Sequence, residues 1–251
     1  MSEIIYLGTW SPQKLDELLR EADNIKDLCE RIAFISMQFL GTPYKESTLI
    51  GNTKTPEMLV INFESFDCFT FLDSIEAMRL SRSFTDFQKN LIQIRYNAGM
   101  VGYEKRNHFF TDWRESNRDF VQDVTAQIGG TKTKTVNKTL NHKDDGSCFL
   151  TGIAPFDRII AYIPPEDVDE TILAGLKTGD YVGIYSELQG LDVSHVGIII
   201  KNPSGPAFRH ASSAPSIRKV VDQDFLEYIS DKPGIIILRP CSNSTKRTCA
   251  A

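Results

Sequence analysis

The sequence of 251 residues lacks several features that mark common classes of protein. Basic residues do not predominate, because 28 Lys and Arg stand against 33 Asp and Glu, and the net charge of −5 argues against a nucleic-acid-binding surface. No apolar run is long enough to cross a bilayer, so we expect no membrane span. No internal repeat is visible. The hydrophobic content of 41% is nevertheless sufficient for a full core, and we expect a single domain over residues 1–251.

Paired cysteines are also missing. The five cysteines are an odd number without C-x-x-C spacing, which fits neither a disulfide framework nor a zinc finger. Cys241 and Cys249 lie close together near the tail and could form one bridge in an oxidising compartment. At least one thiol would still be free.

The spacing of apolar residues divides the chain into a helical part, at about residues 11–125, and a sheet part, at about residues 150–240. Helices are expected at residues 11–40, 66–80 and 84–98. Residues 128–147 are polar and rich in Thr and Lys, and we expect an exposed connector there. Short β-branched runs bounded by turn residues predict antiparallel strands after it. Helices followed by strands indicate an α+β fold.

The stretch "ESFDCFTFLDS" places Cys68 at the start of a predicted helix. Unpaired backbone N–H groups and the positive end of the helix dipole favour a thiolate there. A thiolate can act as a nucleophile in acyl transfer if a base and an orienting group accompany it. Two of the four histidines, His195 and His210, lie on consecutive predicted strands and could supply both.

The turn between these strands decides whether the two histidines meet. A four-residue turn at residues 202–205 pairs Lys201 with Pro206 and makes His210 the diagonal neighbour of His195 on one face. A five-residue turn would place the histidines on opposite faces unless a bulge restored the register. The first arrangement predicts that His195 is the base and that His210 orients it.

Each of these residues also has a less specific interpretation. Cysteine is among the most often buried residue types, and a histidine in an apolar strand is usually a core residue. One Cys and two His could instead hold zinc. The combination of a helix-start cysteine with two histidines on one hairpin favours a catalytic site over these alternatives.

The sequence resembles the NlpC-type papain-like cysteine peptidases of bacterial cell-wall metabolism in five short motifs that occur in the expected order. They are G-x-P-Y at 41–44, D-C-x-x-F at 67–71, L-K-x-G-D at 176–180, H-V-G-I at 195–198 and H-A-S at 210–212. Phe69 stands where the usual nucleophile motif has a small residue. Over about residues 12–240 the chain is more specifically similar to the N-acetylmuramoyl-L-alanine amidase-like subfamily.

This resemblance implies a papain-like core with an additional, mainly helical and loop elaboration. It implies hydrolysis of the amide between N-acetylmuramic acid and L-alanine, in peptidoglycan or in soluble muropeptides that include anhydro forms. Cleavage between γ-D-glutamate and a diamino acid is the alternative. The implied catalytic residues are Cys68, His195 and His210, and Tyr44 is implied to place its hydroxyl where an oxyanion forms. No metal or cofactor is implied.

Compartment and partners follow from the same resemblance. The N-terminus lacks the features of a signal peptide. We expect the cell envelope or periplasm if a leader has been removed, with the cytoplasm as the alternative. The expected partner is peptidoglycan or a muropeptide, bound by a monomer.

The segment "RNHFFTDW" at residues 106–113 has two interpretations. Its aromatic residues could belong to the core, where Trp and Phe are usually found. Alternatively, the segment clamps a saccharide or peptide, with Trp113 stacked on a sugar and with Arg106, His108 and Asp112 bonded to carboxylate or hydroxyl groups.

Two rival classes of function predict other features. A thiol acyltransferase acting on lipids would need an apolar, membrane-facing surface, and no amphipathic or transmembrane segment supplies one. A non-catalytic cell-wall binding module would have no use for a nucleophile with its base.

Overall fold

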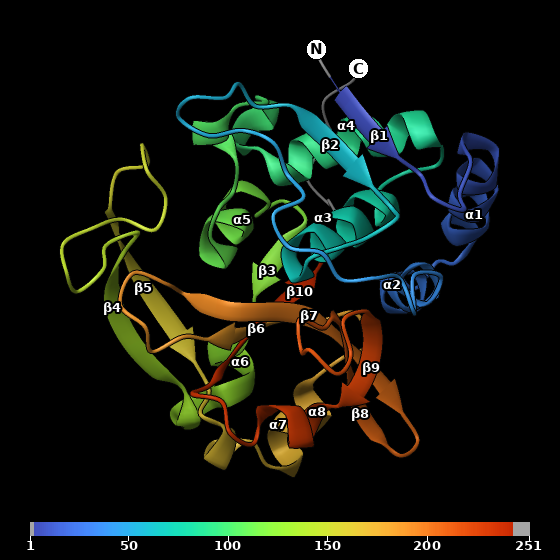
Figure 1. Ribbon diagram of the computed structural model, residues 1–251. Coiled ribbons are helices and arrows are strands. Elements are labelled where there is room, and N and C mark those ends of the chain that lie inside the picture. Colours follow the sequence, from blue (N-terminus) through green and yellow to red (C-terminus); the bar gives the residue numbers. More distant parts are fainter. Residues whose placement is uncertain (1–2, 243–251) are drawn as a thin grey trace, which may run out of the picture.

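The computed structural model describes residues 3–242 and has an α+β architecture in which helices cover a mainly antiparallel sheet (Figure 1). The α-helices are α1 (Pro12–Asn24), α2 (Leu28–Met37), α3 (Cys68–Arg79), α4 (Phe84–Arg95), α5 (Phe110–Ser116), α6 (Thr125–Gly129), α7 (Glu170–Gly175) and α8 (Phe225–Ile229). The strands are β1 (Glu3–Tyr6), β2 (Leu59–Asn62), β3 (Val121–Asp123), β4 (Lys134–Leu140), β5 (Phe156–Tyr162), β6 (Tyr181–Tyr185), β7 (Val193–Asn202), β8 (Gly205–Ala211), β9 (Val220–Asp224) and β10 (Ile235–Pro240). Within the described residues, no helix has the length and apolar character needed to span a bilayer.

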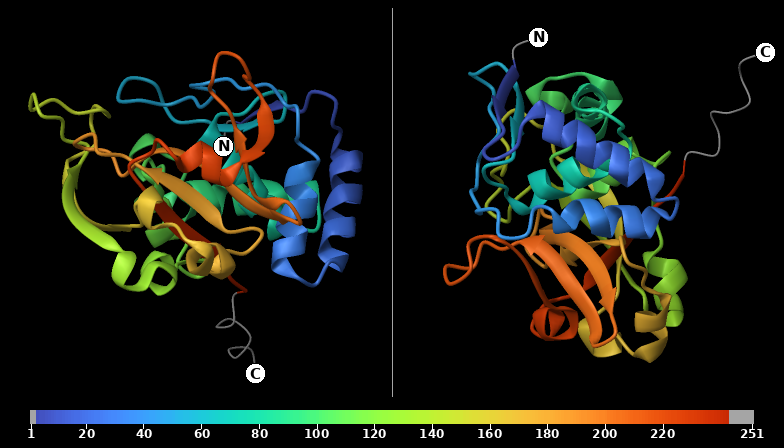
Figure 2. Two further views of the ribbon diagram at one scale, coloured as in Figure 1. Left: turned by 90° about the horizontal axis from the view of Figure 1, so that it is seen from below. Right: turned by 90° about the vertical axis from the view of Figure 1, so that its right-hand side faces the viewer.

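The main sheet has six antiparallel strands in the order β3-β10-β6-β7-β8-β9. Helices α1 to α5 lie on one side of it, and the short helices α6, α7 and α8 lie on the other (Figures 1 and 2). A large apolar core fills the space on the side of the long helices, and a smaller core lies under the short ones. Strand β6 and the middle of β7 are therefore buried on both faces, which explains their nearly continuous apolar sequences.

The helical part largely follows the predicted pattern, with one break. Ser11 caps α1 by accepting the N–H of Lys14, and Pro12 occupies the first helical position. The segment expected to be helical over residues 11–40 forms two helices, because the backbone at Ile25 is extended and Asp27 caps a new helix. The part expected to be helical also contains β3 and β2, and β2 pairs in parallel with β1.

The prediction of an exposed connector at residues 128–147 is wrong, because this stretch contains strand β4. This strand pairs with β5 over its whole length, from Lys134 opposite Tyr162 to Leu140 opposite Phe156, and the two form an arm at the edge of the molecule (Figure 1). Alternate side chains of β4 face inward, and one of them is Lys138, whose ammonium group donates to the carbonyl oxygens of residues 186, 188 and 191. A lysine whose ammonium group is hydrogen-bonded in this way can face inward. The polar composition of these residues therefore did not reveal that they form a strand.

Helix α3 is buried on nearly all sides, although it carries charged residues. Asp73 accepts hydrogen bonds from Arg95 Nε at 2.9 Å and from Trp113 Nε1 at 2.8 Å. One turn further on, Glu76 accepts from Arg79 Nε at 2.8 Å and from the Tyr181 hydroxyl at 2.6 Å. Buried charges are tolerated only when they are paired and hydrogen-bonded. These pairs fix the orientation of the helix that begins at the candidate nucleophile.

The possible bridge between Cys241 and Cys249 involves a residue outside the described part of the chain, because Cys249 is not included in it. No two of the four cysteines within residues 3–242 are joined to each other.

Candidate active site

Cys68 is the first residue of α3, and local sequence determines this position. The Asp67 carboxylate accepts the N–H of Thr70 at 2.7 Å, while the Thr70 hydroxyl accepts the N–H of Asp67 at 3.0 Å. This reciprocal capping box fixes where the helix begins. The backbone N–H of Cys68 therefore lies in the first turn, where it has no partner within the helix.

The two predicted histidines meet as the four-residue turn requires. Strands β7 and β8 pair Lys201 with Pro206 and Asn202 with Gly205, so the prediction of the shorter turn is confirmed. His195 Nε2 lies 2.6 Å from His210 Nδ1, and the two rings are nearly perpendicular. We call His195 and His210 the relay. Because Nε2 of His195 faces His210, its Nδ1 is the ring nitrogen that takes no part in this bond.

Cys68, His195 and His108 line one cavity of about 210 Å³, which we call the catalytic cavity. Its wall is otherwise largely apolar and includes Phe69, Phe109, Phe110, Phe149, Leu150, Leu191 and Val193. Helix α3 packs directly on β7, and the backbone N–H of Val196, the residue after the predicted base, favours a negative sulfur on Cys68. His210, on the neighbouring strand β8, is buried and contacts the His195 ring on its Nε2 side.

Burial dominates the electrostatics of this site. It raises the pKa of the Cys68 thiol to about 12, with a further contribution from the Asp67 carboxylate. The backbone groups of Val196, Cys68 and Phe69 oppose only part of this rise in pKa. Desolvation therefore acts against the resting thiolate that the helix start is expected to favour.

The relay is electrically neutral for the same reason. Burial lowers the pKa of His195 to about 3, assisted by the charges of His210 and Lys232. Burial also lowers the pKa of His210 to about 4, although the hydrogen bond that His210 donates to Gln223 and the charge of Asp222 act in the opposite direction. At neutral pH the site thus holds a thiol and two neutral imidazoles.

Tyr44 lies close to the start of α3. Its segment forms a parallel bridge with Phe66, and Lys45 N–H donates to the Phe66 carbonyl at 2.9 Å. Burial raises the pKa of the Tyr44 hydroxyl, and the negative charges of Cys68 and Asp67 add to the rise. Tyr44 thus lies near Cys68, and the oxyanion-binding role that the family resemblance implied for it stays a prediction.

The segment at residues 106–113 is mostly part of the framework. Trp113 is completely buried and donates to Asp73, so its ring has no face for a sugar, and the core interpretation is the one that the structure supports. Arg106 pairs with the Glu57 carboxylate, whose side chain is only 2% exposed, which leaves the guanidinium committed within the protein. Of the four predicted binding residues in this segment, only His108 lines the catalytic cavity.

The remaining two of these residues are also held by neighbours. Asp112 accepts from Arg158 at 2.5 Å, and burial raises its pKa to about 6 despite this partner. His108 places Nε2 2.7 Å from the Tyr103 carbonyl oxygen, and burial lowers its pKa. A contact of His108 with substrate stays a prediction.

A family model for AmiA-like, N-acetylmuramoyl-L-alanine amidase-like proteins matches residues 34–235. The chain belongs to this amidase-like family. A solved Legionella pneumophila protein of the DUF1460 family is similar in fold, with a TM-score of 0.77 at 23% identity over 91% of this chain and 94% of its own. A solved N-acetylmuramoyl-L-alanine amidase from Bacteroides uniformis gives a TM-score of 0.69 at 25% identity over 91% of this chain and 100% of its own. No curated protein matches the sequence.

Two residues of the amidase-like chain lie against the relay but were not predicted. Gln223 on β9 places Oε1 2.7 Å from Nε2 of His210. Tyr228 on α8 packs its ring 4.9 Å from that of His210 and 6.1 Å from that of His195, and its pKa is raised by burial and by the charge of Cys68. The stretch "VVDQD" shows no alternation of apolar and polar residues that would indicate β9, and nothing in it indicates which residue meets His210.

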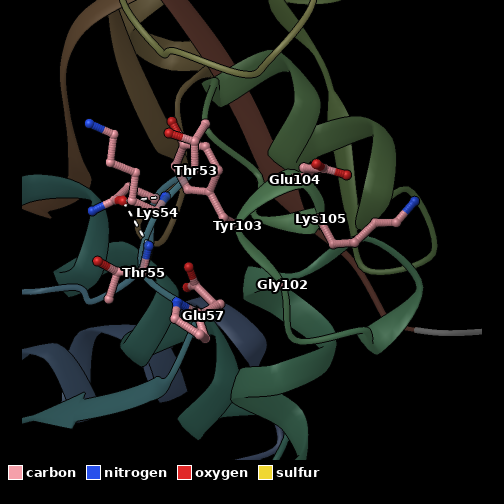
Figure 3. A pocket seen from close by; sticks show the side chains of 10 residues that line it. Thr53, Lys54, Thr55, Glu57, Gly102, Tyr103, Glu104 and Lys105 are labelled. Carbon is pink, nitrogen blue, oxygen red and sulfur yellow. Dashed lines mark hydrogen bonds between the residues drawn. The ribbon is translucent and has the colours of Figure 1, made fainter.

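A second, more open pocket of about 380 Å³ lies between the loops at residues 52–57 and 102–105 (Figure 3). Asn52 Oδ1 accepts the N–H groups of Lys54 and Thr55 and so shapes the first loop. Tyr103 separates this pocket from the catalytic cavity, because its ring packs edge-on against His108.

The zinc alternative would require Cys68, His195 and His210 to converge on one point. Among residues 3–242, no group of three or more His, Cys, Asp or Glu side chains is arranged to hold a metal ion. The two relay imidazoles bond to each other through Nε2 and Nδ1, so these nitrogens are not aimed at a shared point with Cys68.

Proposed function

We propose that this chain is a cysteine amidase that hydrolyses the bond between the lactyl carboxyl group of N-acetylmuramic acid and L-alanine, in peptidoglycan or its soluble fragments, anhydro forms included. The observation that carries the proposal is the presence of Cys68 and His195 in one cavity, with His210 bonded behind His195. The family supplies the choice of bond. The order of cysteine, histidine and histidine along the chain accords with a papain-like, NlpC-type origin.

In the first step, Nδ1 of His195 takes the proton of the Cys68 thiol as the sulfur attacks the lactyl carbonyl carbon. Because the thiol and the imidazole are both neutral at rest, the proton moves during the attack rather than before it. The C=O π bond opens, and its electron pair moves to the oxygen. His210 accepts the hydrogen bond from Nε2–H of His195 and stabilises the imidazolium that forms.

In the second step, the C–N bond breaks and the imidazolium of His195 gives its proton to the leaving amine of alanine. A thioester between Cys68 and the lactyl group remains. Water, deprotonated by His195, then attacks this thioester and releases the lactyl carboxylate, which restores the thiol. No redox partner is required, because every step is a proton or acyl transfer.

The oxyanion of the tetrahedral intermediate needs donors in place before it forms. The N–H of Cys68 is one candidate, since it lies in the first turn of α3 without a partner in the helix. The Tyr44 hydroxyl is the second, because it lies close enough to Cys68 for the charges of the two groups to interact. Apolar walls around the cavity would strengthen both interactions by excluding water.

The test is digestion of defined muropeptides, with and without a 1,6-anhydro sugar end, followed by mass spectrometry of the products. We expect free saccharide and a peptide that begins with L-alanine. Cys68→Ala should abolish the reaction, whereas Cys29→Ala, at a thiol on α2 remote from the site, should leave it unchanged. Fragments cut between γ-D-glutamate and the diamino acid would support the endopeptidase alternative. Full turnover by Cys68→Ala would refute the cysteine mechanism.

A further inference from the structure

We propose that Gln223 is a positioning residue that sets the tautomers of both relay histidines and thereby keeps Nδ1 of His195 free to accept a proton. This inference rests on the proposed function only for its catalytic consequence. The geometry is a continuous chain of three groups: Gln223 Oε1 lies 2.7 Å from His210 Nε2, and His210 Nδ1 lies 2.6 Å from His195 Nε2.

The pairing of strands places Gln223 at the end of this chain. Strand β8 lies between β7 and β9, and Val221 of β9 pairs with His210 while Gln223 pairs with Phe208. Gln223 is therefore the diagonal neighbour of His210 on β9, just as His195 is its diagonal neighbour on β7. His210 is buried between them and contacts a polar side chain on each side.

A count of protons gives the direction of the hydrogen bonds. A neutral imidazole has one N–H donor and one acceptor nitrogen, and an amide oxygen can only accept. With Oε1 facing it, His210 must carry its proton on Nε2, so its Nδ1 is an acceptor. His195 must then carry its proton on Nε2, which leaves the lone pair of Nδ1 for the thiol of Cys68.

The opposite arrangement would inactivate the base. If the side-chain amide donated to His210, both imidazoles would carry their protons on Nδ1, and His195 could not accept one from Cys68. An uncharged acceptor at residue 223 also has an advantage over a carboxylate. A carboxylate would favour a protonated His210, whose Nδ1–H would point at His195 and reverse the tautomer of the base.

The tautomers can be measured without substrate. The chain contains four histidines, so protein labelled with ¹⁵N at histidine gives few imidazole signals in two-dimensional NMR, and single variants assign them. We expect the Nε2–H tautomer at both His195 and His210. An Nδ1–H tautomer at His195 would overturn the proposal, whether or not the protein is an amidase. Failure of the proposed function would instead be seen as absent hydrolysis with these tautomers intact.

Substitution tests the causal role of Gln223. Gln223→Met keeps the length of the side chain but has no amide, so His210 should lose its fixed tautomer. We expect kcat to fall by roughly 10- to 100-fold, the range known for removing the hydrogen-bond partner of a metal-bound histidine. KM should change little, because Gln223 does not line the catalytic cavity. Gln122→Met, at an exposed glutamine on the edge strand β3, is the matched control and should behave as wild type. Unchanged kcat and unchanged tautomers in Gln223→Met would refute the assignment.

Gln223→Glu adds a readout that a merely structural role would not change. It should approach wild-type kcat at high pH, where His210 is neutral, and lose activity on acidification at a pH where the wild type is still active. The ionisable groups that face the relay from the elements around it are Cys68 on α3, Asp222 on β9, Tyr228 on α8 and Lys232 after α8. These groups are common to both proteins, so they do not produce a difference between them. A Gln223→Glu profile parallel to that of Gln223→Met at every pH would contradict the proposal.

Discussion

Mild acid should destabilise this protein through the relay. The folded-state pKa values of His195 and His210 are about 3 and about 4, whereas an unfolded histidine titrates near its usual value of about 6.5. Between these values the unfolded chain binds more protons than the folded one, so stability rises with pH there. The stability is fully present above about pH 6.5 and is lost as pH falls toward the folded-state pKa values.

The size of the loss follows from the same values. Each pH unit below about 6.5 costs about 1.4 kcal/mol per histidine. At about pH 5 the cost is therefore about 2 kcal/mol for each residue and about 4 kcal/mol for both. This is a large share of the roughly 5–15 kcal/mol by which a domain of ordinary stability is folded.

Urea unfolding followed by circular dichroism at about pH 7.5 and about pH 5 measures this quantity. The double variant His195→Gln, His210→Asn cannot take up these protons and should lose about 4 kcal/mol less than the wild type. The buried carboxyl groups of Asp73 and Asp192 also titrate, but they are common to both proteins and cancel in the comparison. His142→Gln, at an exposed histidine, should lose as much stability as the wild type. Equal losses in the double variant and the wild type would refute the argument.

Four further results are expected. His195→Ala should reduce hydrolysis nearly as much as loss of Cys68, whereas His210→Ala should reduce kcat by roughly 10- to 1000-fold; equal, mild effects would contradict the relay. Iodoacetamide should alkylate Cys68 more slowly in His195→Ala than in wild type, because His195 helps to remove the proton of a thiol with a high pKa. Peptide mapping measures the two rates, and equal rates would show that His195 does not assist the thiol. Trp113→Phe should lose about 1–3 kcal/mol in urea unfolding, because Asp73 loses a donor, while KM stays constant; a raised KM with unchanged stability would restore the sugar-binding interpretation. EDTA should leave turnover unchanged, and a loss restored by zinc would favour a metal mechanism.

The parts of the site that the sequence predicted are those that local interactions determine. The capping box that starts α3 at Cys68 involves residues three apart. The register that joins His195 and His210 follows from one short turn between adjacent strands. Both could be deduced from the sequence because each depends on a few consecutive residues and on fixed backbone geometry.

The parts that it could not predict depend on distant partners. Whether Trp113 faces solvent or the core is decided by Asp73, which lies forty residues earlier in the chain. Whether residues 128–147 form a strand is decided by carbonyl groups of the loop before β7, which accept the Lys138 ammonium. Gln223 reaches His210 only because β9 pairs with β8 after a long connection at residues 212–219, whose path the sequence does not fix.

The high pKa of Cys68 has a consequence for the lifetime of the enzyme in an oxidising environment. Peroxides attack thiolates, so a cysteine that remains protonated at rest is converted slowly to the sulfenic acid and its irreversible products. The desolvated start of α3 and the neighbouring Asp67 carboxylate hold the sulfur in this protected form. In the proposed mechanism, the sulfur becomes reactive only when His195 removes its proton during attack on a bound amide. Damage to the thiol should therefore accumulate during turnover rather than during storage.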